Sequence, residues 1–315
     1  MSRAPQVAVI GTGRLGTRLA EQLVLDRACK TVLLYNRSSR RLRGTLLTLG
    51  LWSEIIHARV RLREVEWGSV ARIDIVVMAV KEDYDPRDLL ETGDQPAWLP
   101  HNLRYVGLSR DIHLVRQVCA KLRGFSGTIV VITNPVDVVT ALVQKWVPTA
   151  SVLGVGLTVD EARVACLLRR TAPSLRRRIR CPLGGEHGSG IVPLYSLWQP
   201  SPRQLRGLGI EPSALVAQAS EVGVHLVRDL GYTLHDCAVV FSQDIAWLLG
   251  GNHASGYRSF CTAESGLPVG RPLRRGRNRR LHPVPLHAQE ERQIRRVAAR
   301  LAKIADAAEQ EWLTS

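Results

Sequence analysis

The fold of this chain is decided by residues 7–16, Val-Ala-Val-Ile-Gly-Thr-Gly-Arg-Leu-Gly. Val7 to Ile10 form a short, mainly β-branched run of the kind that a buried parallel strand requires. Three glycines follow at once, and leucines at 15, 19 and 23 then recur at helical spacing. A G-x-G-x-x-G sequence between a strand and a helix predicts a turn that binds a dinucleotide, although an ordinary glycine-rich turn has the same composition.

Each glycine of this turn has a defined part in that prediction. Gly11 permits the tight turn, Gly13 lets the backbone approach a pyrophosphate, and Gly16 lets the helix pack closely on the strand. The pyrophosphate would lie at the N-terminus of the helix, where free N–H groups and the helix dipole favour an anion. The predicted cofactor-binding residues of the turn are Gly11, Gly13, Arg14, Leu15 and Gly16.

The end of the second predicted strand, residues 31–35, indicates which dinucleotide binds. Proteins that use NAD usually have an acidic residue here, which binds the ribose 2′-hydroxyl and would repel a 2′-phosphate. This chain has Asn36 instead, followed by Arg37, Ser38 and Arg41. Amide, hydroxyl and guanidinium groups suit a phosphate, so NADP(H) is favoured and NAD(H) is the alternative. These arginines would otherwise be the solvated start of a helix.

The rest of the first half repeats the strand–helix pattern. Further strands are predicted over 73–79, 128–132 and 151–154, and helices over 110–123 and from after Asp137 to 146. The sequence therefore predicts an α/β protein with a Rossmann-type doubly wound parallel sheet in residues 1–154, the dinucleotide-binding domain.

From about residue 157 the pattern changes, and an α+β substrate domain is expected over 155–315. Helices are predicted over about 159–168, over 211–250 with a break near Gly231, and over 288–313. The stretch 256–285, rich in Gly, Pro and Arg, is expected to be irregular or to form short antiparallel strands.

Composition excludes several classes of function. The six cysteines are scattered without a C-x-x-C pair and the chain has no eighteen-residue apolar run, so we expect free thiols, no metal site and no membrane partner. With no apolar segment after Met1, a cytoplasmic protein is expected. The net charge of +15 comes mostly from arginine. Without a lysine-rich tail, it does not indicate a nucleic-acid partner. The run 271–280 is predicted to be a solvated or interface loop, with a phosphate contact as the alternative.

Residues 184–196, Gly-Gly-Glu-His-Gly-Ser-Gly-Ile-Val-Pro-Leu-Tyr-Ser, hold one histidine, His187, between small residues in a predicted loop. Upstream, Asp160 and Arg163 are three residues apart and share one face of a predicted helix. Such a pair is ordinarily a surface ion pair. Beside a histidine and a cofactor, however, the same residues could orient an imidazole and bind a carboxylate.

These motifs together resemble those of the lactate/malate dehydrogenase family, in order and in spacing, over nearly the whole chain. They are the glycine turn, Asn134-Pro-Val-Asp137, Asp160-x-x-Arg163, Gly185-Glu-His-Gly188 followed by Ile-Val-Pro-Leu-Tyr-Ser, and Leu230-Gly-Tyr-Thr233. The resemblance implies that the protein is an enzyme and that it forms a homodimer or homotetramer.

The resemblance also implies roles for single residues. His187 would give and take the proton at the reacting carbon's oxygen, and Asp160 would hold its imidazole in the right tautomer. Arg163 would bind a substrate carboxylate through two parallel hydrogen bonds. Asn134 would contact the substrate or the nicotinamide ribose, and Thr233 would line the substrate pocket.

The segment after the strand at 73–79 departs from the family pattern. The resemblance places Arg87 as the arginine that polarises the carbonyl, with Arg110 as its rival, and Lys81 at the residue that selects the substrate. Residues 81–108 are expected to form a long loop or lid, broken by a short helix at 87–90, and residues 91–107 look like an insertion in it. Acidic residues at 82, 83 and 85 favour a substrate larger or more cationic than malate or lactate.

The sequence therefore predicts an NADP(H)-preferring oxidoreductase that transfers hydride to the carbonyl of a small carboxylate substrate, a 2-oxo acid or a relative of one. One alternative is a reductase of a larger carbonyl or imine. The other is a non-catalytic protein that senses NADP(H) or forms a scaffold.

Overall fold

The computed structural model describes residues 4–93, 96–175, 179–250, 256–264, 266–277 and 280–314. Its strands are β1 (Gln6–Ile10), β2 (Thr31–Tyr35), β3 (Arg61–Glu64), β4 (Ile75–Met78), β5 (Thr128–Val131), β6 (Ser151–Gly154), β7 (Leu183–Glu186), β8 (Gly190–Pro193), β9 (Tyr257–Glu264), β10 (Leu267–Arg275) and β11 (Leu281–Pro283).

Its helices are α1 (Arg14–Leu25), α2 (Ser39–Ile55), α3 (Pro86–Thr92), α4 (Leu108–Lys121), α5 (Val136–Trp146), α6 (Leu157–Thr171), α7 (Pro202–Gly207), α8 (Pro212–Leu230), α9 (His235–Leu249) and α10 (Ala288–Thr314). Short 3-10 helices are η1 (Trp67–Arg72), η2 (Pro173–Leu175) and η3 (Tyr195–Leu197).

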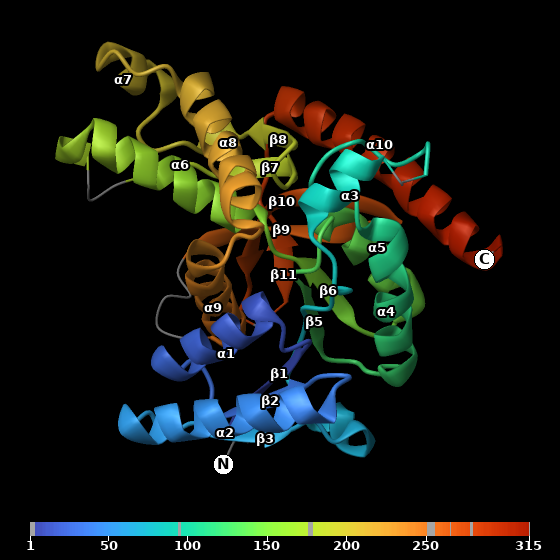
Figure 1. The fold of residues 1–315 in the computed structure, drawn as a ribbon. Coiled ribbons are helices and arrows are strands. Elements are labelled where there is room, and N and C mark those ends of the chain that lie inside the picture. The colour runs from blue at the N-terminus through green and yellow to red at the C-terminus, as the bar shows by residue number, and fades with distance from the viewer. Residues whose placement is uncertain are drawn as a thin grey trace.

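Six parallel strands form the first part of a sheet, in the order β3-β2-β1-β4-β5-β6 (Figure 1). This is the strand order of a Rossmann fold, and the order reverses between β1 and β4. Ligands of such sheets bind outside the carboxyl ends of the strands at that reversal. The predicted fold class is therefore confirmed, and its binding edge lies where the glycine turn leaves β1.

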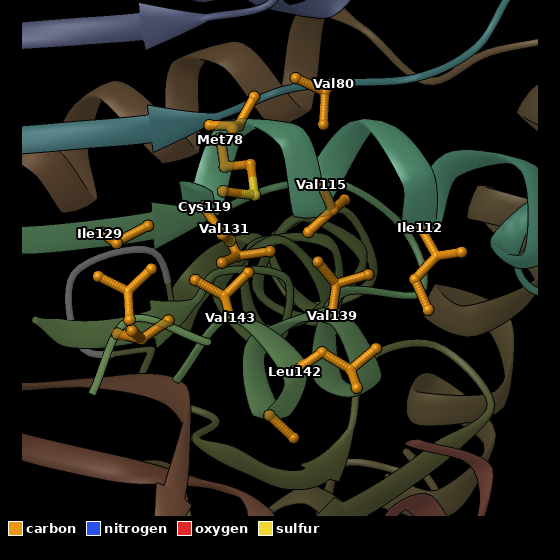
Figure 2. Close-up of a cluster of buried hydrophobic side chains, with 14 of the residues drawn as sticks. Met78, Val80, Ile112, Val115, Cys119, Ile129, Val131, Val139, Leu142 and Val143 are labelled. Carbon is orange, nitrogen blue, oxygen red and sulfur yellow. The ribbon is translucent and has the colours of Figure 1, made fainter. Parts of the chain in front are cut away.

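Alternate residues of the central strands face two separate cores, because side chains alternate across a sheet. Val7 and Val9 pack in a cluster with α1 and α9, whereas Ala8 and Ile10 face the opposite cluster. Figure 2 shows side chains of that second cluster from β4, α4, β5 and α5 pointing toward one another. Both faces are covered by helices, so the strands are apolar throughout, as parallel strands must be.

The second half of the chain returns to the same sheet. β9 lies antiparallel to β6, with Gly154 opposite Cys261, and β10 and β11 extend the edge as an antiparallel meander. The expectation of short or irregular structure over 256–285 is thus wrong in extent, because β9 and β10 have eight and nine residues. Pro268 and Pro272 both lie in β10, although proline has no N–H to donate and is ordinarily confined to edge strands, strand starts and bulges.

The arginine run 271–280 is not a solvated loop throughout. Arg271 is buried within β10 and donates to Glu291 at 2.8 Å, and only the later residues follow the strand. An arginine in a strand can be buried when a carboxylate pairs with it, which composition alone does not show. Residues 278 and 279 lie outside the described part of the chain.

Within the loop predicted over 81–108, α3 forms where a short helix was expected. Leu99, Tyr105 and Val106 are at most 5% exposed and belong to the core beside α4 and α5. Because these buried apolar side chains lie on both sides of residues 100–104, they attach this short segment to the hydrophobic core. Residues 94 and 95 of the predicted insertion lie outside the described part.

A separate layer carries the histidine motif. α6 packs against α8, and the β7–β8 hairpin lies between β10 and α10 (Figure 1). The β7–β8 hairpin therefore lies next to the carboxyl end of the parallel sheet. In the described part of the chain, no helix has the length and apolarity needed to cross a membrane.

Candidate active site

The glycine turn has the shape that a dinucleotide requires. Gly11 has φ +103°, and a Cβ there would lie 2.4 Å from the Ala79 carbonyl oxygen. A Cβ on Gly16 would lie 1.9 Å from the Gly11 oxygen and 3.4 Å from Val9 Cγ1 of β1, so the helix packs closely on both the turn and the strand. Gly13, by contrast, has no atom within 4 Å of the position of its missing Cβ, and α1 begins after it without a side-chain cap. Open space beside uncapped N–H groups fits a phosphate.

The end of β2 is held by hydrogen bonds of Asn36. Its Nδ2 donates to Thr12 Oγ1 at 2.9 Å, and its Oδ1 accepts from the Ser38 N–H at 2.9 Å. Ser38 in turn caps α2 by accepting from the N–H of Arg41. No carboxylate occupies the position that follows the strand, so the site does not repel a 2′-phosphate there.

Arg37 is engaged by an acid that the sequence pattern did not connect with it. Its two terminal nitrogens donate to the two oxygens of Glu82 at 3.0 and 2.8 Å, across the gap between the ends of β2 and β4. Both side chains are partly exposed. A phosphate at this edge of the sheet would therefore compete with Glu82 for the same guanidinium.

His187 lies in the turn between β7 and β8, pinned by its backbone and its ring. Its N–H donates to Asp137 Oδ2 at 3.0 Å, and its Nδ1 is 2.7 Å from Asp160 Oδ2. The ring packs on Gly156, where a Cβ would lie 2.5 Å from the His187 Cγ. Nδ1 therefore faces the carboxylate, which leaves Nε2 as the nitrogen able to exchange a proton elsewhere.

Asp160, in the first turn of α6, is fully buried. Its Oδ2 also accepts from the Gly188 N–H at 3.0 Å, and its Oδ1 is 3.6 Å from Arg163 Nη1. Burial by itself would raise the pKa of Asp160, but His187 and the nearby arginines outweigh it, so the pKa is lowered. A buried carboxylate that stays ionised can orient an imidazole and stabilise its protonated form.

The surroundings of the His187 imidazole favour its neutral form by lowering its pKa. Burial lowers the pKa of His187, Asp160 opposes that effect, and the positive charge of Arg104 adds to the lowering. The net pKa lies below the ordinary 6.5. Such a histidine accepts a proton as a base and returns it as an acid when a reaction makes the site more negative.

A second acidic layer supports the turn from behind. Glu186, at the end of β7, accepts hydrogen bonds from Tyr105 Oη at 2.6 Å and Ser189 Oγ at 2.8 Å, and is paired with Arg300 of α10. Asp137 lies close by, and burial raises its pKa to about 7, with a contribution from the charge of Glu186. This layer fixes both ends of the histidine turn.

Arg163 is buried and its fork is occupied. Nε and Nη2 both donate to Asp236 Oδ2, at 3.0 and 2.7 Å. Asp236 stands in the first turn of α9, three residues after Thr233. The predicted carboxylate clamp thus holds a carboxylate of the protein. An apolar pocket of about 390 Å³ opens next to this pair, lined by residues of α6, α8 and the α8–α9 turn, among them Thr233.

The remaining predicted residues are Asn134, Lys81 and Arg87. Asn134 is exposed at the carboxyl end of β5. Lys81 donates to the Tyr84 carbonyl oxygen and lies over the Tyr84 ring. Arg87 is bound to Asp85 at 2.5 Å and donates to the Arg228 carbonyl oxygen. Its part in catalysis therefore stays a prediction, and an internal acid already engages it.

Arg104 is a residue of the site that the sequence did not single out. Its guanidinium lies over Gly188, where a Cβ would be 2.0 Å from Cζ, and it reaches Gly223 of α8 beside Arg163. An arginine in an apparent insertion carries no motif, so only the fold brings it to His187. Among the described residues, no group of three or more His, Cys, Asp or Glu side chains is placed to hold a metal ion.

Comparison with known proteins agrees with this architecture. No family model matches the sequence. The chain is 25% identical over 234 residues to the L-lactate dehydrogenase of Salinibacter ruber, which covers 73% of this chain and 70% of that protein. It is 27% identical over 195 residues to L-lactate dehydrogenase 1 of Bifidobacterium longum, covering 61% of this chain and 57% of that protein.

Two solved structures share the fold over almost their whole length. A lactate dehydrogenase from a Medee basin deep-sea metagenome library superposes with a TM-score of 0.82 at 16% identity, covering 98% of this chain and 100% of that one. The malate dehydrogenase of Plasmodium falciparum gives a TM-score of 0.79 at 16% identity, covering 97% and 99%. With its motifs in order around a paired histidine and aspartate, the chain is similar in sequence to L-lactate dehydrogenases and shares its fold with lactate and malate dehydrogenases.

Proposed function

We propose that this protein is an NADP(H)-preferring oxidoreductase that interconverts a 2-oxo acid and the corresponding 2-hydroxy acid. The observation that supports the proposal best is the buried pair of His187 and Asp160, with Nδ1 and Oδ2 2.7 Å apart. The pair lies at the carboxyl edge of a sheet whose glycine turn leaves room for a dinucleotide. A histidine held in one tautomer next to a cofactor site is suited to proton transfer.

Residues of the glycine turn and of the β2 end would hold the cofactor. The N–H groups of Arg14 and Leu15 open α1 at the unobstructed face of Gly13, and Asn36 and Arg37 stand where the adenosine ribose of such folds is bound. A bound nicotinamide supplies hydride to a carbonyl carbon, or accepts hydride from a hydroxyl-bearing carbon.

His187 would handle the proton that accompanies hydride transfer. During reduction, the protonated Nε2 gives its proton to the carbonyl oxygen as that oxygen gains charge, and the ring becomes neutral. During oxidation, the neutral ring takes the hydroxyl proton. Asp160 stabilises the protonated ring in both directions, because its carboxylate stays ionised beside Nδ1.

Turnover would be tested with purified protein, NADPH and a panel of 2-oxo acids, following nicotinamide absorbance. We expect His187→Asn to lose at least about 100-fold in kcat, because general acid–base catalysis contributes that much or more. Thermal unfolding should show the variant folded. A variant with full activity would refute the role of His187. NADPH binding without turnover on any member of the panel would favour a sensor or scaffold.

The preference for NADP(H) would be tested at the Arg37–Glu82 pair. Arg37→Ala should weaken NADPH binding by about tenfold or more and leave NADH nearly unchanged, since a charge-assisted hydrogen bond is worth about 1.5–3 kcal/mol. Glu82→Gln should tighten NADPH, because it removes the acid that now engages Arg37. Equal NADPH/NADH ratios in all three proteins would show that Arg37 does not select the cofactor.

We also propose that the chain works as a homo-oligomer. Leu47, Leu51 and Ile55 recur every four residues on α2 and are 65%, 54% and 74% exposed. Such an apolar stripe on one helix face is suited to self-association. Light scattering would give the mass in solution, and Leu51→Glu should lower it toward that of a monomer.

A further inference from the structure

We propose that Arg104, rather than Arg163, is the main ligand of the substrate carboxylate in this chain. This inference rests on the proposed function, because it names the residue that fixes the substrate beside His187. It is carried by the position of Arg104, by the way its neighbours are anchored and by the distribution of charge around the two arginines.

The guanidinium of Arg104 lies on the histidine turn itself. A Cβ on Gly188 would meet its Cζ, Nη2 and Nε at 2.0, 2.2 and 2.3 Å, so the group lies directly against the α-carbon next to His187. Gly188 has φ +86°, a conformation that favours glycine, and the absence of a side chain leaves the space that the guanidinium occupies. The guanidinium therefore lies against the turn that carries His187, and its positive charge lowers the pKa of that imidazole.

The backbone around Arg104 is fixed. On one side Asn102 Oδ1 accepts from the Arg104 N–H at 3.0 Å. On the other side, Tyr105 is 1% exposed, and its hydroxyl donates to Glu186 at 2.6 Å. Glu186 is the residue that precedes His187. The end of β7 therefore helps to position both the imidazole of His187 and the guanidinium of Arg104. Binding groups held in place before the ligand arrives lose less entropy when they bind it.

The charges favour an anion at Arg104. Within the described part of the chain, the Arg104 side chain has no hydrogen-bonding or ion-pairing partner. Arg163, its neighbour, already has Nε and Nη2 on Asp236. Both guanidinium groups converge on Gly223, where a Cβ would lie 2.7 Å from Arg163 Nη1 and 3.3 Å from Arg104 Nη2. Two adjacent cations, one with all its donors free, attract a carboxylate.

Asp236 changes what Arg163 can do. A substrate carboxylate could form a two-point contact with Arg163 only by displacing Asp236, whose single oxygen accepts both donors. Arg104 meets no such competitor. Asp236 therefore selects Arg104 as the ligand and leaves Arg163 as a buried support next to it.

The experiment uses oxamate, which has the carboxylate and carbonyl of a 2-oxo acid but is not reduced. Oxamate is titrated calorimetrically into the NADPH-bound protein. Arg104→Gln should raise the oxamate Kd by about 10- to 100-fold, the loss expected for a charge-assisted hydrogen bond, and Arg104→Lys should recover part of it. Arg123→Ala, an exposed arginine beyond the end of α4, is the charge-matched control and should bind as wild type does.

Two further readouts separate a binding role from a structural one. Asp236→Asn should tighten oxamate, because it frees the fork of Arg163. For the oxidation reaction, Arg104→Gln should also move the acidic limb of the kcat/KM profile to higher pH, because it removes a cation that lowers the pKa of His187.

Wild-type affinity for oxamate in Arg104→Gln would overturn the inference, as would a wild type that binds NADPH but no oxamate. Failure of the wild type to bind NADPH or to reduce any 2-oxo acid would instead count against the proposed function.

Discussion

Asp160 Oδ2 accepts from two donors of the same turn, the Nδ1–H of His187 at 2.7 Å and the N–H of Gly188 at 3.0 Å. One carboxylate oxygen thus fixes the ring and the backbone beside it. Because Asp160 is fully buried, water does not substitute for either bond. Asp160 and the histidine turn are therefore coupled, and the effect of the Asp160 charge on His187 can be tested with a substitution that removes the charge and keeps the shape of the side chain.

Asp160→Asn should lower the pKa of His187 further, because the carboxylate charge is what raises it against burial. Reduction needs a protonated ring, so kcat for reduction should fall at least about 100-fold at neutral pH. For oxidation, the acidic limb of the pH profile should move to lower pH. Steady-state rates in both directions across pH provide the check, with exposed Asp306→Asn as control; an unmoved limb would show that Asp160 does not tune His187.

Gly13→Ala should damage cofactor binding without damaging the fold. No protein atom lies within 4 Å of the added methyl group, so stability should change by no more than about 1 kcal/mol. The NADPH Kd should nevertheless rise at least about tenfold, since the methyl group fills the space that the phosphate needs. Thermal unfolding with and without NADPH would measure both quantities.

Gly44→Ala provides the matched control for Gly13→Ala. Gly44 lies within α2, again with no atom within 4 Å, so alanine should stabilise the protein by about 0.5–1 kcal/mol and leave NADPH binding as it is. Unchanged NADPH affinity in Gly13→Ala would mean that the cofactor binds elsewhere.

Asp137 should make stability depend on pH. Its folded pKa is raised to about 7 from 3.8, so the folded state retains a proton that the unfolded state releases between these values. Stability should therefore fall as pH rises from about 4 to about 7, by up to a few kcal/mol, and level off above. Asp137→Asn cannot ionise and should reduce this slope in urea unfolding, leaving the part due to Asp111, Glu161 and Asp244, whose pKa values are also raised, whereas Glu211→Gln on the surface should leave it nearly unchanged. A parallel slope in wild type and Asp137→Asn would disprove the assignment.

Tyr105→Phe should loosen the support of the site. It removes a buried donor to the Glu186 carboxylate, which should cost about 1–3 kcal/mol of unfolding free energy. KM should rise more than kcat falls, because Arg104 would be less well held. Tyr195→Phe, on the half-buried η3 segment, should cost less than about 0.5 kcal/mol. Equal losses of unfolding free energy in the two variants would show that the hydrogen bond from Tyr105 to Glu186 has no special role in supporting the site.

The parallel sheet could be predicted because its signals are local. Apolar strands followed by glycine or polar turns read the same way wherever they occur, and β1, β2, β4, β5 and β6 lie within a residue or two of their predicted places. β3 was not predicted, because Arg61–Glu64 has exposed, charged side chains typical of an edge strand. β9 and β10 were underestimated because their stability comes from pairing with each other and with distant β6.

Residues of the candidate site could be predicted from the sequence only where they belong to a recognisable motif. His187 and Asp160 lie 27 residues apart in sequence and meet as the resemblance implied. Asp236 and Glu82 could not have been connected with Arg163 and Arg37, since acids of this kind are common on surfaces and their partners depend on tertiary packing. Arg104 was hidden for a similar reason, within a segment that has no counterpart in the family pattern.

The pairing of β6 with β9 has a consequence for how the polypeptide acquires its structure. During synthesis, the six parallel strands are complete at Gly154, yet the outer edge of β6 stays uncovered until more than a hundred further residues have emerged. An uncovered apolar edge invites pairing with other chains. A shortened polypeptide that stops after β6 should therefore aggregate even though it contains every strand of the nucleotide fold, and the carboxy-terminal meander protects the sheet as well as completing it.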